Sequence, residues 1–140
     1  KDRSHIAKMG IKAAQVSNSF AMYRRSTLIA LGGFPYNNFG EDMLIGAKAI
    51  LAGYKVAYVG AACVYHSHGF TLAQEYARYR EIGTFHRNQP WLLQHFGKAE
   101  SEGKRFVISE LKYLAKHEPW SIPKAFASTV IKYFGYKSAQ

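Results

Sequence analysis

The sequence has little cysteine, little acidic charge and no long apolar run, and each shortage excludes a class of protein. Its one cysteine, Cys63, rules out a disulfide within the chain and leaves no cysteine cluster for structural zinc. No stretch approaches the roughly 18 consecutive apolar residues that a membrane-spanning helix needs. The charged opening KDRSHIAKMG lacks the apolar centre of a signal peptide. We therefore expect a cytoplasmic location.

What the chain does contain is enough for a folded core. Its 140 residues are 48% hydrophobic and 15% aromatic, which argues against disorder. Nineteen Lys and Arg against nine Asp and Glu give a net charge of +10. This charge suits an anionic membrane, a phosphorylated substrate or nucleic acid, and alone it does not choose among them. Position 1 is lysine rather than methionine, so we expect the chain to be part of a longer protein.

The pattern of apolar residues and breakers predicts a few short strands and then helices. Strands are expected over 16–23, 55–59 and 62–68. Helices are expected within 24–34 (capped by Ser26), 43–53 (ended by Gly53), 71–88 (capped by Thr71 and stopped by Pro90), 91–97, about 100–118 and 122–137. Asn37 and Asn38 are expected to form a turn. The class is therefore α/β, with too little strand for a complete sheet.

Two adjacent acids, Glu41 and Asp42, stand where the loop PYNNFG meets the start of a helix. Acidic residues are favoured there for structure alone, because the helix N-terminus carries partial positive charge. A catalytic interpretation needs a carboxylate in a cleft, within reach of a substrate hydroxyl, to act as a general base. The spacing alone leaves both interpretations open.

A second candidate site is His66-Ser67-His68. Residues two apart on a strand point to the same face, so both imidazoles could face one cleft. Imidazole is a common metal ligand, yet two histidines without a carboxylate or cysteine make no complete site. The alternative is a pair of partly exposed histidines at a strand end.

Small polar residues, Ser17-Asn18-Ser19, lie a few positions before Arg24-Arg25. Short hydroxyl and amide side chains supply donors and acceptors that suit sugar hydroxyls, and paired arginines can bind phosphate. The alternative is a polar strand end followed by a solvated arginine pair.

The C-terminal region combines aromatic and basic residues at helical spacing. Ile122, Phe126, Val130, Tyr133 and Phe134 follow this spacing, and no acid occurs after Glu118. Such a helix can lie on an anionic membrane surface. It can also pack on its own domain, with its lysines extending to water.

Together, SNSFAMYRRS, GGFPYNNFGEDM, AKAILAGYKVAYV, VYHSH and ARYREIG resemble, in order and spacing, the bacterial family-2 glycosyltransferases. The resemblance is strongest to the rhamnosyltransferase group of surface-polysaccharide gene clusters. It covers most of the chain, most strongly from Val16 to Gly97, and the tail FGKAESEGKRFVISELKYL resembles the ending of the same group. The resemblance implies the acceptor-side, C-terminal half of a GT-A fold over residues 1–97, followed by a helical extension over 98–140. An inverting transfer from a nucleotide-diphospho-sugar to a saccharide or lipid-linked acceptor is then expected.

The same resemblance implies roles for individual residues. Asp42 matches the catalytic base, with Glu41 as its neighbour. The residues expected to bind substrate are Ser17, Asn18, Ser19, Arg24 and Gly40. Of the metal candidates His66 and His68, one, with His66 favoured, resembles the family residue that approaches a divalent metal, Mg²⁺ or Mn²⁺, or the donor diphosphate.

One departure from the family pattern is large. The family's nucleotide-binding half carries an Asp-x-Asp motif, whereas the only aspartates here are Asp2 and Asp42. We therefore expect the chain to be inactive alone. The alternatives are a membrane-surface module attached to the inner face of the plasma membrane, and a nucleic-acid-binding module, which the scattered charge and the lack of a reader motif disfavour. A homodimer through an exposed sheet edge is also open.

Overall fold

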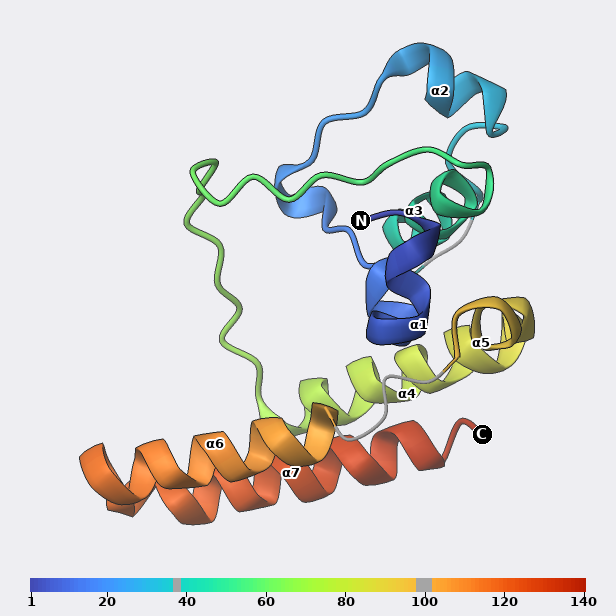
Figure 1. Cartoon of the computed structure of the whole chain (residues 1–140). Coiled ribbons are helices and arrows are strands. Elements are labelled where there is room, and N and C mark those ends of the chain that lie inside the picture. Colours follow the sequence, from blue (N-terminus) through green and yellow to red (C-terminus); the bar gives the residue numbers. More distant parts are fainter. Residues whose placement is uncertain (37–38, 98–101) are drawn as a thin grey trace. The chain divides into compact units, whose positions relative to one another are not determined.

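The computed structural model describes residues 1–36, 39–97 and 102–140, and within them the chain is helical (Figure 1). The helices are α1 (Ile6–Met9), α2 (Arg25–Ala30), α3 (Glu41–Leu51), α4 (Leu72–Asn88), α5 (Pro90–Phe96), α6 (Glu102–His117) and α7 (Ile122–Lys137). Short 3₁₀ turns cover Arg3–His5, Gly10–Ala13, Asn18–Phe20 and Pro119–Ser121. The chain forms two compact units, Lys1–His68 with Gln89–Ala99 and Gly69–Asn88 with Glu100–Gln140.

The first unit is organised around α3, the most buried of its helices. Apolar residues recur along this helix at the spacing that lines one side. The buried apolar residues of the unit are Ile11, Ala13, Ala14, Leu44, Ile45, Ala47, Ala49, Ile50, Leu92 and Phe96. Gly46 lies so close to the preceding segment that a Cβ there would meet the Ala14 carbonyl oxygen and, at 2.9 Å, Val16. This close approach places the polar turn at residues 17–19, which follows Val16, beside α3.

Gly53 ends α3 as its sequence position predicted. Its φ of 87° is in the left-handed region, which glycine adopts without steric cost. Gly53 donates to the Ile50 carbonyl at 3.0 Å and Tyr54 donates to the Ala49 carbonyl at 2.9 Å. This pair of bonds is a Schellman motif, which satisfies carbonyls that the helix end leaves free.

The second unit is built from α4, α6 and α7, with α4 and α7 in close contact. Gly83 of α4 faces α7, where a Cβ would lie 2.6 Å from the Tyr136 carbonyl oxygen. Gly135 of α7 faces α4, where a Cβ would lie 2.6 Å from the Tyr76 carbonyl oxygen. Two glycines, one on each helix, therefore let the backbones approach closely.

A polar pair lies beside this contact. Nδ1 of His86 is 3.0 Å from the Tyr136 hydroxyl oxygen. Burial lowers the pKa of His86, which favours the neutral ring, and the tautomer of that ring decides whether Nδ1 accepts from the Tyr136 hydroxyl or donates to it. The α4–α7 contact thus combines close backbone approach with a satisfied polar pair.

The predicted strands over 16–23, 55–59 and 62–68 are not found in the part of the chain that the structure describes. Residues 18–20 form a 3₁₀ turn, and residues 54–71 carry no helix or strand. A strand needs a row of hydrogen bonds to a neighbour. In 55–59 the described bonds join Val56 to Lys1, whose carbonyl accepts from the Val56 amide at 2.8 Å and whose terminal ammonium donates to the Val56 carbonyl. Another closes a turn in which the Val59 carbonyl accepts from the Ala62 amide at 3.0 Å. The expected α/β character is therefore not confirmed, although the helices that follow are.

The predicted helix caps have different outcomes. Thr71 is confirmed, because its Oγ1 accepts from the Gln74 amide at 3.3 Å while Gln74 Oε1 accepts from the Thr71 amide at 2.9 Å. Ser26 is wrong: the residue at the cap position is Arg24, and Ser26 lies inside α2. Asn37 and Asn38, expected in a turn, lie outside the described residues. No described helix is long and apolar enough to cross a membrane.

Replacing Gly135 with alanine should destabilise the second unit, because the new methyl would press on the Tyr76 carbonyl and, at 3.2 Å, on Tyr79 Cβ. Overpacking of this kind costs about 1–3 kcal/mol. Urea unfolding followed by circular dichroism measures the loss. Gly103→Ala is the matched control, since it lies in a helix with nothing within 4 Å and should gain up to about 1 kcal/mol. Equal effects of the two variants would contradict the close α4–α7 contact.

Candidate active site

The two acids predicted as catalytic are the first two residues of α3. Gly40 precedes them with φ 76° and ψ 19°, a left-handed conformation that glycine allows. Its carbonyl accepts from the Leu44 amide at 3.0 Å and so begins the helix. Glu41 and Asp42 are both half-buried. Gly40 therefore serves to turn the chain so that two neighbouring carboxylates sit at a helix N-terminus, where negative charge is favoured.

Both carboxylate oxygens of Asp42 accept hydrogen bonds from backbone amides. Oδ1 accepts from the Met43 amide at 2.7 Å. Oδ2 accepts from the Asn18 amide at 3.2 Å, across 24 positions of sequence. The side chain is thus oriented from both sides, and the second bond ties the start of α3 to the polar turn at 17–19.

Asn18 connects the members of this cluster. Its side-chain Nδ2 donates to Glu41 Oε1 at 2.9 Å, while its own amide holds Asp42. Its Oδ1 accepts from the Tyr23 hydroxyl at 2.7 Å. One residue, predicted to bind substrate, therefore contacts both carboxylates and a tyrosine.

The two serines shape the turn that presents Asn18. Ser17 Oγ accepts from the Ser19 amide at 3.4 Å and donates to Ser19 Oγ at 3.1 Å. Both serines are exposed, so their hydroxyls retain further hydrogen-bonding capacity toward solvent or a ligand. The structure thus brings five of the predicted residues together with Gly40: Ser17, Asn18, Ser19, Glu41 and Asp42.

Tyr23 belongs to the same cluster, and the sequence did not single it out as a site residue. Its ring packs edge-on against Phe34, with centroids 5.2 Å apart, which holds the hydroxyl toward Asn18. Burial first, and then the negative charges of Asp42 and Glu41, raise the pKa of Tyr23 above its ordinary value. In the sequence, Tyr23 is recognisable only as a tyrosine five positions after the polar residue Asn18, and this pattern is too common to identify a site residue.

Three predicted residues lie apart from this cluster. Arg24 is exposed at the cap position of α2, and no described contact joins it to the carboxylates. His66 and His68 are exposed in the segment 54–71, with their ring centroids 4.4 Å apart in an edge-on arrangement. The histidines are close to one another, as predicted, but no described contact brings them to Asp42.

The described residues do not fit a divalent metal on their own. Within them, no group of three or more His, Cys, Asp or Glu side chains converges. Two imidazoles provide two ligands, whereas Mg²⁺ demands an octahedral set made mainly of oxygen atoms. The cluster around Asp42 has other chemistry: two oriented carboxylates and exposed hydroxyls that can accept from and donate to a substrate hydroxyl.

Comparison with known proteins places the chain in a family. Residues 3–113 match the family described as glycosyl transferase family group 2, and the chain belongs to this family. Its domain fits a GT-A-like fold. The family commonly uses a divalent metal.

Two curated relatives are similar along almost the whole chain. They are WbaN of Salmonella anatum and RfbN of Salmonella typhimurium, each named an O-antigen chain rhamnosyltransferase. Each is 49% identical over 138 residues, which are 98% of this chain and 44% of the relative. The chain therefore spans less than half the length of the curated relatives it matches. No solved structure matches it.

Neutralising the two acids should lower the pKa of Tyr23. Carbon-13 NMR of the tyrosine ring carbon that bears the hydroxyl measures this pKa in Glu41→Gln, Asp42→Asn and the double variant. We expect a fall toward, but not to, the ordinary value, because burial is the larger cause and remains.

The raised pKa also means that Tyr23 favours folding below its unfolded pKa, and this contribution is lost as pH rises through the folded pKa.

Tyr136 provides the control for this measurement. Burial raises its pKa too, opposed by a hydrogen bond with Gln140, and neither acid contributes. Its pKa should not change in any of the three variants. A Tyr23 pKa that stays fixed when both acids are neutralised would show that the carboxylates do not lie beside it.

Proposed function

We propose that this chain is the acceptor-side part of an inverting glycosyltransferase that acts in surface-polysaccharide synthesis, with Asp42 as the general base. The observation that carries the proposal is the double anchoring of Asp42 by the amides of Asn18 and Met43. A base must be held within hydrogen-bond reach of the proton that it removes, and these bonds fix its position before substrate arrives. Family membership and the names of the two relatives support the reaction class.

In the proposed reaction, Asp42 accepts the proton of an acceptor hydroxyl. The hydroxyl oxygen forms a bond to the anomeric carbon of the donor sugar, on the face opposite the leaving group. The bond from that carbon to the nucleotide diphosphate breaks, and the diphosphate leaves with the electron pair. The result is one displacement with inversion, in which Asp42 retains the proton until solvent removes it.

The neighbours of Asp42 take supporting roles in this proposal. Glu41, fixed by Asn18 Nδ2, orients a second acceptor hydroxyl. Ser17 and Ser19 offer exposed hydroxyls to the acceptor, and Gly40 contacts it at the helix start. Arg24, exposed at the cap of α2, binds a phosphate group of the substrate. Tyr23 positions Asn18 and needs no contact with substrate.

The histidine pair has a place on the donor side of this proposal. His66 and His68 make an incomplete ligand set for Mg²⁺ or Mn²⁺, so we assign them to hydrogen bonds with the donor diphosphate. Both are exposed near the end of the segment 54–71. A segment that lacks strand pairing of its own can pair with a nucleotide-binding half, as the GT-A-like fold of the family implies. Residues 1–97 then form the acceptor-side half and 98–140 a helical extension.

The role of Asp42 can be tested by exchanging this chain for the matching segment of WbaN. The chimera should restore O-antigen synthesis in a Salmonella anatum strain that lacks WbaN. Asp42→Asn keeps the side-chain size but removes the base, and we expect transfer to fall by about 10²–10⁴-fold. Asp2→Asn is the matched control, because Asp2 is the other aspartate and serves as a cap for residues 3–5. It should leave transfer unchanged.

Protein levels of the chimera and its variants are compared by immunoblot, so that a loss of transfer is not a loss of protein. Asp42→Asn at normal level with full O-antigen synthesis would overturn the assignment of the base. A well-expressed chimera that fails to restore synthesis would overturn the proposed substrate class, even with Asp42 intact.

A further inference from the structure

Helix α7 packs on α4 through small residues and Tyr136, which leaves its other aromatic residues exposed. Gly135 meets the backbone of α4, and Ser128 Oγ donates to Glu75 Oε2 at 2.7 Å. Lys132 Nζ lies 3.2 Å from Glu75 Oε1, on the same side. The side of α7 that usually carries large apolar residues into a core thus carries glycine, serine and a paired lysine.

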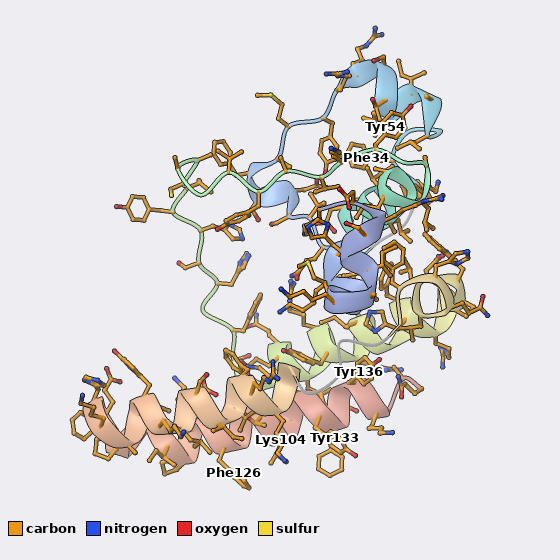
Figure 2. All side chains as sticks on the ribbon, in the orientation of Figure 1. Phe34, Tyr54, Lys104, Phe126, Tyr133 and Tyr136 are labelled. Atoms are coloured by element: carbon orange, nitrogen blue, oxygen red, sulfur yellow. The ribbon has the colours of Figure 1, made fainter. Side chains whose placement is uncertain are left out.

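The opposite side of α7 carries an exposed aromatic face, which we define as Phe126, Tyr133 and Phe134. Their exposed fractions are 66%, 58% and 60%. Phe126 and Tyr133 are about two helical turns apart and so lie on one side of the helix. Figure 2 shows both side chains projecting from the side of α7 turned away from α4. Tyr133 and Phe134 contact each other edge-on, with ring centroids 5.7 Å apart.

Three more aromatic side chains of the second unit are also exposed. Trp120, in the turn between α6 and α7, is 75% exposed, and Phe106 and Tyr113 of α6 are 62% and 60% exposed. An isolated exposed apolar side chain needs no explanation, whereas a set that recurs along two neighbouring helices indicates an interaction surface.

Positive charge accompanies these rings. Lys104 and Lys137 are exposed, and no acid follows Glu118 in the sequence. Lys124 acts electrostatically on Glu75 instead, so it belongs to the side of α7 that faces α4. In the view of Figure 2, Lys104 of α6 projects to the same side as Phe126 and Tyr133. Long lysine side chains can lay their methylene groups along apolar surface while the ammonium group reaches a negative partner.

We propose that the aromatic face of α7, with the lysines beside it, docks on an anionic phospholipid surface. This goes beyond the proposed function, because it assigns a binding surface to helices that carry no predicted site residue. Tyrosine and tryptophan favour the headgroup level of a bilayer, phenylalanine the acyl boundary, and lysine the anionic phosphates. A second copy of the chain is a poorer occupant, because copies with a net charge of +10 repel one another.

Flotation of the 140-residue chain with lipid vesicles tests this proposal. We expect binding to vesicles of phosphatidylcholine with phosphatidylglycerol, weaker binding to phosphatidylcholine alone, and loss of binding in high salt. The double variant Phe126→Ser/Tyr133→Ser should bind at least about tenfold more weakly. The matched control is Tyr58→Ser/Tyr65→Ser, which removes two exposed rings from the first unit and should bind as wild type does.

A charge-reversal pair separates the contribution of the lysines. Lys104→Glu/Lys137→Glu should weaken binding to the anionic vesicles, while Lys8→Glu/Lys55→Glu, also at exposed positions, should weaken it less. Circular dichroism verifies that each variant keeps its helix content.

Three results would overturn the proposal. They are no flotation with anionic vesicles, unchanged binding of the folded Phe126→Ser/Tyr133→Ser variant, and equal losses in the two aromatic pairs. Dimerisation in analytical ultracentrifugation that this variant abolishes, without vesicle binding by wild type, would assign the face to a second copy. None of these measurements depends on sugar transfer, so the outcome is independent of the proposed function.

Discussion

Two neighbouring carboxylates can stay half-buried only where enough hydrogen-bond donors hold them, and this constraint shapes the candidate site. The N-terminus of α3 supplies the Met43 amide, and the turn at 17–19 supplies two donors from Asn18. Without the turn, Glu41 and Asp42 would be ordinary acids at a helix start. With it, they become an oriented pair.

Packing elsewhere in the first unit makes these hydrogen bonds possible. Gly46 lies one helical turn after Asp42 and allows the segment at Ala14 and Val16 to approach α3 closely. The chain then needs only a short 3₁₀ turn to bring Asn18 to both carboxylates. The sequence, the packing and the candidate site are thus connected. Because Gly46 has no side chain, the segment before Asn18 can pack against α3 and bring Asn18 to Asp42.

The sequence predicted best what depends on local chemistry. Gly53 and Thr71 mark helix ends through bonds to residues within one turn, and both were predicted correctly. Strands depend on partners distant in sequence, so Val and Tyr enrichment in 55–68 could not show whether a partner is present. Contacts between residues distant in sequence are equally invisible in a local pattern. The sequence therefore predicted Asn18 and Asp42 as separate candidates and did not identify Tyr23. It also left open whether the aromatic residues of α7 face inward or outward.

The most direct test of the account is whether the 17–19 turn and the start of α3 bind an acceptor together. Nitrogen-15 NMR of the labelled chain, titrated with oligosaccharides prepared from the O-antigen of Salmonella anatum, measures this residue by residue. The account predicts joint shifts of the Asn18, Ser19, Glu41 and Met43 amides at the same saccharide concentration. Shifts confined to other residues, or none at saccharide concentrations that saturate other weak sugar sites, would contradict it.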